Sequence, residues 1–381
     1  MNRAYSVVLP DETTTLLLRA CVLTGAVGST AFEDWLARVG DPFAALRAGN
    51  WRTKAILPLL WANLRQAGHE PPSTALRAHL RAAAERERLR TEPHRDVVAS
   101  VLATVAADDH TIRLLASGVL AETAYPAPEL RHNYGVELLV FEDEISGMAR
   151  TLRRIAEPAV DDETRFLHPS TVPITLRTRF TPECYAAPRP DAASASADVE
   201  LSGHRCATLT PESMLAQVCA QAFTAGAAAG DVTWIPDAWF TLASTPHFDW
   251  DALVSTVDER GWSIPVATTL SYLARELGLP IRDDALASLV GAANQASRTD
   301  RDLAMAFAWP AAHRSADPRR FRLSPRDACA FARWRLAPSP GFMRATRPVE
   351  GPGDLALAYA RRPLTFLRRR AHSFRGARRP T

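Results

Sequence analysis

The chain has 381 residues, of which 47% are hydrophobic and 23% are charged, and its formal net charge is +3. This composition supplies enough apolar side chains for a sizeable core, so it excludes a chain that is disordered as a whole. No uncharged apolar run approaches the roughly 18 residues that span a bilayer, and the N-terminal segment lacks the apolar run of a signal peptide. We therefore expect a cytoplasmic protein. The five cysteines are widely spaced and odd in number, which argues against a disulfide framework.

Residues 1–108 are predicted to form an N-terminal helical region. Apolar residues recur at helical spacing over 13–25 and 53–68, and each stretch ends in a glycine. The stretch 73–92 is rich in Ala and Arg after a serine start, which predicts a solvent-facing helix. A second helix, buried on one side, is predicted over 95–109.

Residues 109–210 are predicted to form a small α/β core. Strands are expected over 111–117, 135–141 and 172–180, where β-forming residues alternate. A helix with acids in its first turn is predicted between the second and third strands. The last element is a hairpin over 198–210 that turns at Ser202 and Gly203.

The chain then returns to helices. Residues 211–290 are predicted to form a helical domain, in which Thr210 is the N-cap of the first helix and Pro211 its first residue. Residues 291–381 are predicted to form a helical extension with an Arg-rich tail. The tail arginines are Arg361, Arg362, Arg368, Arg369, Arg370, Arg375, Arg378 and Arg379.

One part of the predicted core has a pattern that indicates phosphate and metal binding. The first strand ends in Ser117 and Gly118, a turn whose backbone N–H groups can hold a phosphate. Glu137 lies on the next strand, and Gly135 lies beside it because alternate residues of a strand share a face. Mg²⁺ binds through one or two carboxylates together with substrate phosphates. Two carboxylates at i and i+2 would bridge a pair of ions, but only Glu137 is present here.

Five stretches, in the same order, resemble a poorly characterised bacterial nucleotidyltransferase family of the DNA polymerase β-like superfamily. The resemblance covers about Leu57 to Pro280. It implies an α/β (α+β) fold, with a small nucleotidyltransferase-type mixed-sheet core flanked by helical N- and C-terminal regions. It also implies Mg²⁺-dependent transfer of a nucleotidyl group from an NTP to a small-molecule, peptide or protein acceptor. The stretches are "ILPLLWANL", "LLASGVLAETAYPAPELR", "NYGVELLV", "LTPESMLAQVCAQA" and "WIPDAWFTLAS…FDWDALVSTVDERG".

The resemblance implies a role for each matching position. Glu137 matches a metal carboxylate, so it is the expected catalytic and metal-binding residue. Ser117, Gly118 and Arg131 are expected to bind the nucleotide phosphates. Asp237 is retained, and we expect it to be structural, fixing the helix that packs over the core.

The departures from the family pattern occur at the positions that would bind the metal and the phosphates. Ser117 stands where the family has a lysine, and Gly135 stands where it has the first metal aspartate. Arg177 and Gln221 stand at two positions that the family fills with histidine. Only one metal carboxylate therefore remains by type, at Glu137. The residues favour a degenerate homologue and the resemblance favours an enzyme, so both hypotheses stay open.

Other interpretations of these residues also stay open. An alternative interpretation makes Glu137 an exposed strand acid paired with a nearby arginine, and Arg131 a surface or capping residue. Asp198 and Glu200, spaced i and i+2 on the hairpin, either replace the lost carboxylates or form a solvated face. A degenerate homologue would act as a binding or scaffolding partner in a biosynthetic cluster. The tail offers a third function, binding to nucleic acid or a membrane surface.

Overall fold

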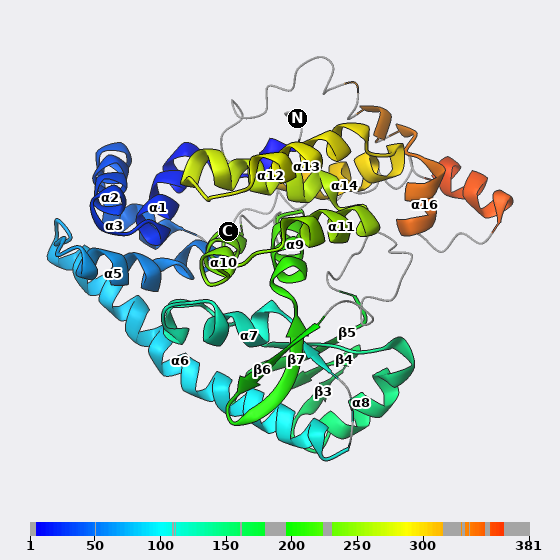
Figure 1. Ribbon diagram of the computed structural model, residues 1–381, viewed down its shortest axis with the longest axis horizontal. Helices are drawn as coiled ribbons and strands as arrows, with labels where there is room; N and C mark the ends of the chain where they lie inside the picture. Colours follow the sequence, from blue (N-terminus) through cyan, green and yellow to red (C-terminus); the bar gives the residue numbers. More distant parts are fainter. Residues whose placement is uncertain are drawn as a thin grey trace, which may run out of the picture.

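The structure is a computed structural model that describes residues 5–49, 51–108, 110, 112–160, 162–179, 196–223, 231–314, 329, 332–334, 336–346 and 351–361. In this part of the chain a mixed sheet of seven strands is flanked by helices from both ends of the sequence (Figure 1). This confirms the predicted α/β fold class. The tail segment 362–381, for which the sequence predicts a nucleic-acid or membrane partner, lies outside the described residues.

The N-terminal helices are short amphipathic segments separated by residues that start and stop helices. Asp11 accepts a hydrogen bond from the N–H of Thr14, and Asp41 accepts one from the N–H of Ala44, so both act as N-caps. Gly40 follows the second long helix with a φ of 68°. The elements are η1 (Ser6–Val8), α1 (Glu12–Val22), α2 (Gly25–Val39), α3 (Pro42–Ala48), α4 (Trp51–Lys54) and α5 (Leu57–Gln66).

The two helices predicted over 73–92 and 95–109 are one continuous helix, α6 (Thr74–Ala106), of 33 residues. Ser73 caps its start by accepting a hydrogen bond from the N–H of Leu76. Pro93 lies inside the helix, where its missing N–H removes one helical hydrogen bond. The helix nevertheless continues because its second half buries an apolar stripe, and this packing outweighs the local loss. The stripe is Val97, Val98, Val101, Leu102 and Val105.

The sheet has the strand order β3-β4-β5-β2-β1-β7-β6. The pairs β2–β5 and β1–β7 are parallel, and the other neighbouring pairs are antiparallel. The sequence did not predict β3 and β4, in which only Phe166 is buried. The strands are β1 (Arg113–Leu114), β2 (Val136–Leu139), β3 (Glu157–Ala159), β4 (Asp162–Leu167), β5 (Pro173–Arg177), β6 (Ser196–Leu201) and β7 (His204–Leu209).

The first predicted strand, 111–117, is much shorter in the structure. After β1 the chain leaves the sheet, and α7 (Ala116–Thr123) begins at once. Ser117 and Gly118 therefore lie in the first turn of a helix. The predicted hairpin is confirmed, with Ser202 and Gly203 at φ values of 50° and 76° in its turn.

The two faces of the central strands differ in burial. One face is fully buried, and its side chains include Leu114, Val136, Leu138 and Ile174. Helix α6 contacts β2 and β7, and α8 (Ile145–Leu152) contacts β4, so these helices cover that face. In Figure 1, α6 runs beneath the sheet on the side away from helices α9 to α14. The opposite face of the central strands is only partly covered, and it carries the polar side chains described below.

The helices after the sheet complete the hydrophobic core. Thr210 accepts a hydrogen bond from the N–H of Ser213 and Pro211 is the first helical residue, as predicted. None of the helices in the described part of the chain combines the length and the apolar character needed to cross a membrane. The elements are α9 (Pro211–Gln221), α10 (Trp234–Ala243), α11 (Trp250–Arg260), α12 (Ser263–Tyr272), η6 (Leu273–Leu277), α13 (Asp283–Gln295), α14 (Arg298–Arg314) and α16 (Pro340–Thr346).

Candidate functional site

The candidate site lies on the partly covered face of strands β1, β2 and β5. Glu137 pairs with Thr175 across the β2–β5 ladder, and Leu139 pairs with Arg177 in the next row. Leu139 also pairs with Arg113 on β1. Since paired residues and alternate residues share a face, all five side chains leave the sheet on the same side. Of these, only Leu139 is fully buried.

Helix α7 brings Ser117 onto Glu137. The Ser117 hydroxyl accepts a hydrogen bond from the backbone N–H of Glu137 at 3.2 Å and lies 3.5 Å from Oε2 of the same residue. The Leu115 N–H donates to the Glu137 carbonyl, and after this bond the chain turns away from β2 into α7. The Ser117 hydroxyl therefore accepts the Glu137 N–H in place of a backbone carbonyl. Ser117 therefore holds the strand end in place as well as lining the site.

Gly118 lies where α7 approaches β1 most closely. A Cβ on this residue would lie 3.1 Å from Cδ2 of Leu114, so the glycine permits the tight turn. Its own N–H donates to the carbonyl of Leu115 at 2.8 Å. One of the backbone donors that the sequence assigns to a phosphate is thus already engaged in the turn.

The carboxylate of Glu137 is bound by an arginine. Nε and Nη2 of Arg177 both donate to Oε1 of Glu137, at 3.0 and 2.5 Å. The side chains are 25% and 26% exposed, so the pair is half-buried and open to solvent on one side. Sequence reasoning named Arg177 only as a departure from the family histidine. The parallel register of β2 and β5, which no sequence pattern fixed, places it beside Glu137.

The residues around Glu137 do not fit a divalent cation. Mg²⁺ demands oxygen ligands in near-octahedral geometry, and Glu137 is a single carboxylate with a guanidinium on one oxygen. Among the residues that the structure describes, no group of three His, Cys, Asp or Glu side chains could hold a metal. Asp198 and Glu200 lie on β6, which β1 and β7 separate from β2. Three strand spacings put them about 14 Å from Glu137, too far to replace the missing carboxylate.

The backbone at Gly135 leaves no room for a side chain. Its φ is +154°, and a Cβ there would lie 2.4 Å from the carbonyl oxygen of Pro173. The Gly135 carbonyl accepts a hydrogen bond from Nε2 of His94 on α6 at 3.2 Å. Burial lowers the pKa of His94, which favours the neutral imidazole. A carboxylate at position 135 would therefore require a different path of the chain.

Arg131 and Asp237 lie in a buried network that joins the sheet region to α10. Nε and Nη2 of Arg131 each donate to one carboxylate oxygen of Asp237 at 2.8 Å. Nη1 of Arg131 donates to Oδ1 of Asn133, and the hydroxyl of Tyr125 donates to Asp237. Burial opposes the charge of Arg131, but the nearby carboxylate outweighs this and raises its pKa. All three nitrogens of this guanidinium are thus engaged by protein groups.

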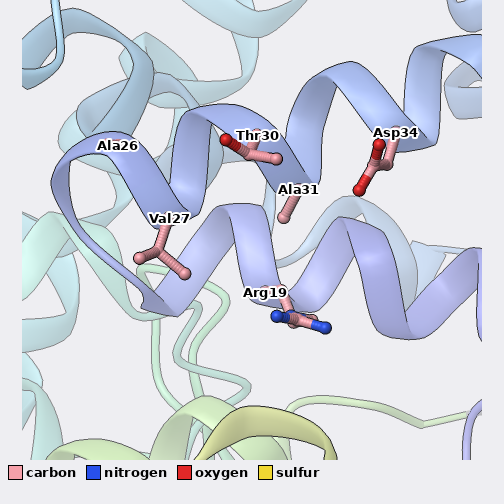
Figure 2. A pocket seen from close by; sticks show the side chains of 6 residues that line it. All are labelled: Arg19, Ala26, Val27, Thr30, Ala31 and Asp34. Carbon is pink, nitrogen blue, oxygen red and sulfur yellow. The ribbon is translucent and has the colours of Figure 1, made fainter.

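A separate hollow of about 250 Å³ lies on the N-terminal helices (Figure 2). Arg19 contributes from α1, and the other lining residues come from α2. Half of its lining residues are small and apolar, and the others are Arg19, Thr30 and Asp34. None of the predicted site residues contributes to it. The residues are Arg19, Ala26, Val27, Thr30, Ala31 and Asp34.

Comparison with known families gives a match at the described site. The model of a family described as an uncharacterised nucleotidyltransferase matches residues 50–278, more than half of the 381 residues. The matched range runs from the N-terminal helices through the sheet to η6, and it includes Ser117, Glu137, Arg177 and Asp237. Comparisons with curated proteins and with solved structures found no match.

Proposed function

We propose, from the premise that this chain belongs to a family of uncharacterised nucleotidyltransferases, that it keeps the family's fold without Mg²⁺-dependent nucleotidyl transfer. Family membership implies an NTP as the ligand class, and divalent metals are the general cofactor of such families. This chain's own residues no longer supply the carboxylate ligands that the metal needs. The protein then acts as a non-catalytic binding or scaffolding homologue.

One observation carries the proposal. The only carboxylate at the expected metal position, Glu137, is bound on Oε1 by both Nε and Nη2 of Arg177. A metal would have to displace a guanidinium and would gain only one anionic ligand. Phosphoryl-transfer enzymes depend on electrostatic stabilisation by correctly placed ions, so a site with one engaged carboxylate loses most of its catalytic power.

The remaining site residues take roles that agree with this proposal. Ser117 and Gly118 shape the turn of α7 beside Glu137. Ser117 stays the proposed contact for a phosphate, whereas the N–H of Gly118 already donates to the Leu115 carbonyl. Arg131 and Asp237 are assigned to structure, because they neutralise each other in a buried, bidentate pair. Arg131 is therefore not proposed as a phosphate ligand. The acceptor and any tail-dependent partner stay open.

The test is a calorimetric titration of the full chain with ATP, GTP, CTP and UTP, with and without Mg²⁺, together with a pyrophosphate-release assay. We expect weak binding that Mg²⁺ strengthens by no more than about twofold, because one engaged carboxylate adds little to metal affinity. We also expect no pyrophosphate release above that of a blank. Tight binding that requires Mg²⁺, disappears in Glu137→Gln and accompanies pyrophosphate release would contradict the proposal.

A further inference from the structure

We propose that Arg177 takes the electrostatic place of the metal ion, so that this site binds a phosphate-bearing anion without a divalent cation and in competition with Glu137. The inference rests on the proposed function and specifies the ligand and the cation of the same site. It differs from a simple loss of the site. The positive charge is retained, but it is covalently part of the chain.

The geometry of Arg177 supports this assignment. Two of its three nitrogens donate to one oxygen of Glu137, whereas Nη1 has no hydrogen-bond partner in the described part of the chain. The side chain is 26% exposed, so an anion from solvent can reach the guanidinium. Guanidinium groups bind carboxylate and phosphate by the same planar, two-pronged geometry. A phosphate can therefore take the place that the Glu137 carboxylate now holds.

Further arginines lie on the same face of the sheet as Arg177. Arg113 lies on the same face, in the same row as Leu139 and Arg177, and its Nε is buried without a hydrogen-bond partner in the described structure. Arg165 on β4 pairs with Thr175 and adds a third arginine to this face. The carboxylates on this face are Glu137, Glu163 by alternation along β4, and, on the outer strands, Glu157, Asp198 and Glu200. Asp162 also lies within electrostatic range of Arg165 and Arg177. Glu137 is the carboxylate that binds Arg177 directly.

Glu137 acts in this arrangement as an internal competitor. It neutralises Arg177 when no ligand is present, and it repels any phosphate that approaches the same guanidinium. A substitution of Glu137 is therefore expected to change the affinity for phosphate in one direction only. In a metal-dependent enzyme, removing the metal carboxylate weakens nucleotide binding. Here, removing the charge of Glu137 frees Arg177 and strengthens binding.

The experiment titrates the full chain with ATP and with inorganic tripolyphosphate, in EDTA and again in Mg²⁺. Glu137→Gln is expected to bind both probes about tenfold tighter than wild type in EDTA, because a competing charge-assisted hydrogen bond is removed. Arg177→Gln is expected to bind at least about tenfold more weakly, and Arg177→Lys to recover part of the loss. Mg²⁺ should weaken binding, since it neutralises the phosphates that Arg177 recognises. Tripolyphosphate separates phosphate recognition from contacts with the base.

Asp198→Asn is the matched control, because Asp198 also pairs with an arginine, Arg205, on an exposed strand of the same sheet. It should bind within about twofold of wild type. Circular dichroism checks that each variant folds. Should Glu137→Gln not fold, the wild-type protein alone still tests the inference, because binding to a fixed cation must occur in EDTA and weaken as salt rises.

The outcomes separate the inference from the proposed function. Glu137→Gln binding no tighter than wild type, or Arg177→Gln binding as well as wild type, overturns the inference and leaves the proposed loss of catalysis standing. Wild-type binding that requires Mg²⁺ and is abolished in Glu137→Gln overturns both. Tighter binding of both probes by Glu137→Gln in EDTA, lost with Arg177, supports the inference.

Discussion

The backbone conformation of Gly135 determines whether a substitution can restore the missing metal carboxylate. Its φ of +154° is a conformation that side chains with a Cβ rarely adopt, and the Cβ would lie 2.4 Å from the Pro173 carbonyl oxygen and 2.7 Å from its Cγ. Both contacts involve the neighbouring strand β5, which pairs with β2 along its whole length. The pair of acids at i and i+2 therefore cannot be restored without moving the strand that carries Arg177.

Substitution of Gly135 is expected to destabilise the protein rather than create a metal site. Gly135→Asp and Gly135→Ala should each lower the free energy of unfolding by about 2–4 kcal/mol, from backbone strain plus the clash with Pro173. Denaturant unfolding measures this. Gly291→Ala is the control, since Gly291 lies inside α13 with open space around its Cβ position and should gain about 0.5–1 kcal/mol. A stable Gly135→Asp protein that binds Mg²⁺ would refute this account of position 135.

At the scale of elements, the network around Asp237 connects α10 to the segment between α7 and β2. Arg131 and Asp237 are 8% and 3% exposed in their side chains, so neither charge has water to compensate it. The cost of burying both is offset only while the two remain together and the other polar atoms stay hydrogen-bonded. The network therefore fixes how the helices after the sheet dock on the core.

Removal of one charged partner from this network is expected to lower the free energy of unfolding. Asp237→Ala leaves the guanidinium of Arg131 buried without a counter-charge and should lower the free energy of unfolding by about 3–5 kcal/mol. Tyr125→Phe removes one hydrogen bond to the same carboxylate and should cost about 1–2 kcal/mol. Denaturant melts compare both with Asp198→Asn, whose exposed pair with Arg205 should contribute less than about 1 kcal/mol. Equal effects from Asp237 and Asp198 would contradict the structural role.

Local signals explain which elements the sequence could predict. The hairpin at Ser202 and Gly203 and the N-cap at Thr210 depend on residues close in the chain, and both are confirmed. The prediction of two separate helices over 73–92 and 95–109 is wrong, because the apolar stripe that holds α6 together acts through contacts with distant strands. Glu137 was identified from its place on the predicted strand and from the family resemblance. Its partner Arg177 was not, because the register between β2 and β5 joins residues 40 positions apart.

At the scale of the whole molecule, stability depends on helix α6, which packs against the sheet and carries two histidines with lowered pKa values. Burial lowers the pKa of His94, and burial together with nearby basic residues lowers that of His79. A histidine whose pKa is lower in the folded than in the unfolded state resists protonation on folding. Its contribution to stability is therefore complete above the unfolded pKa of about 6.5 and is lost as the pH falls below it.

The free energy of unfolding is accordingly expected to fall as the pH is lowered from 7 to 5, with a slope of at most about 1.4 kcal/mol per pH unit for each histidine. The carboxylates with lowered pKa values, such as Asp108 and Asp162, add a second loss only at lower pH, because their ordinary pKa is 3.8. His94→Gln keeps a donor for the Gly135 carbonyl and removes the titrating group, so it should flatten the decline between pH 7 and 5. His247→Gln, at an exposed position, is the control and should keep the wild-type profile. Denaturant melts at half-unit pH intervals measure the slopes, and an unchanged slope in His94→Gln would show that His94 does not cause the decline.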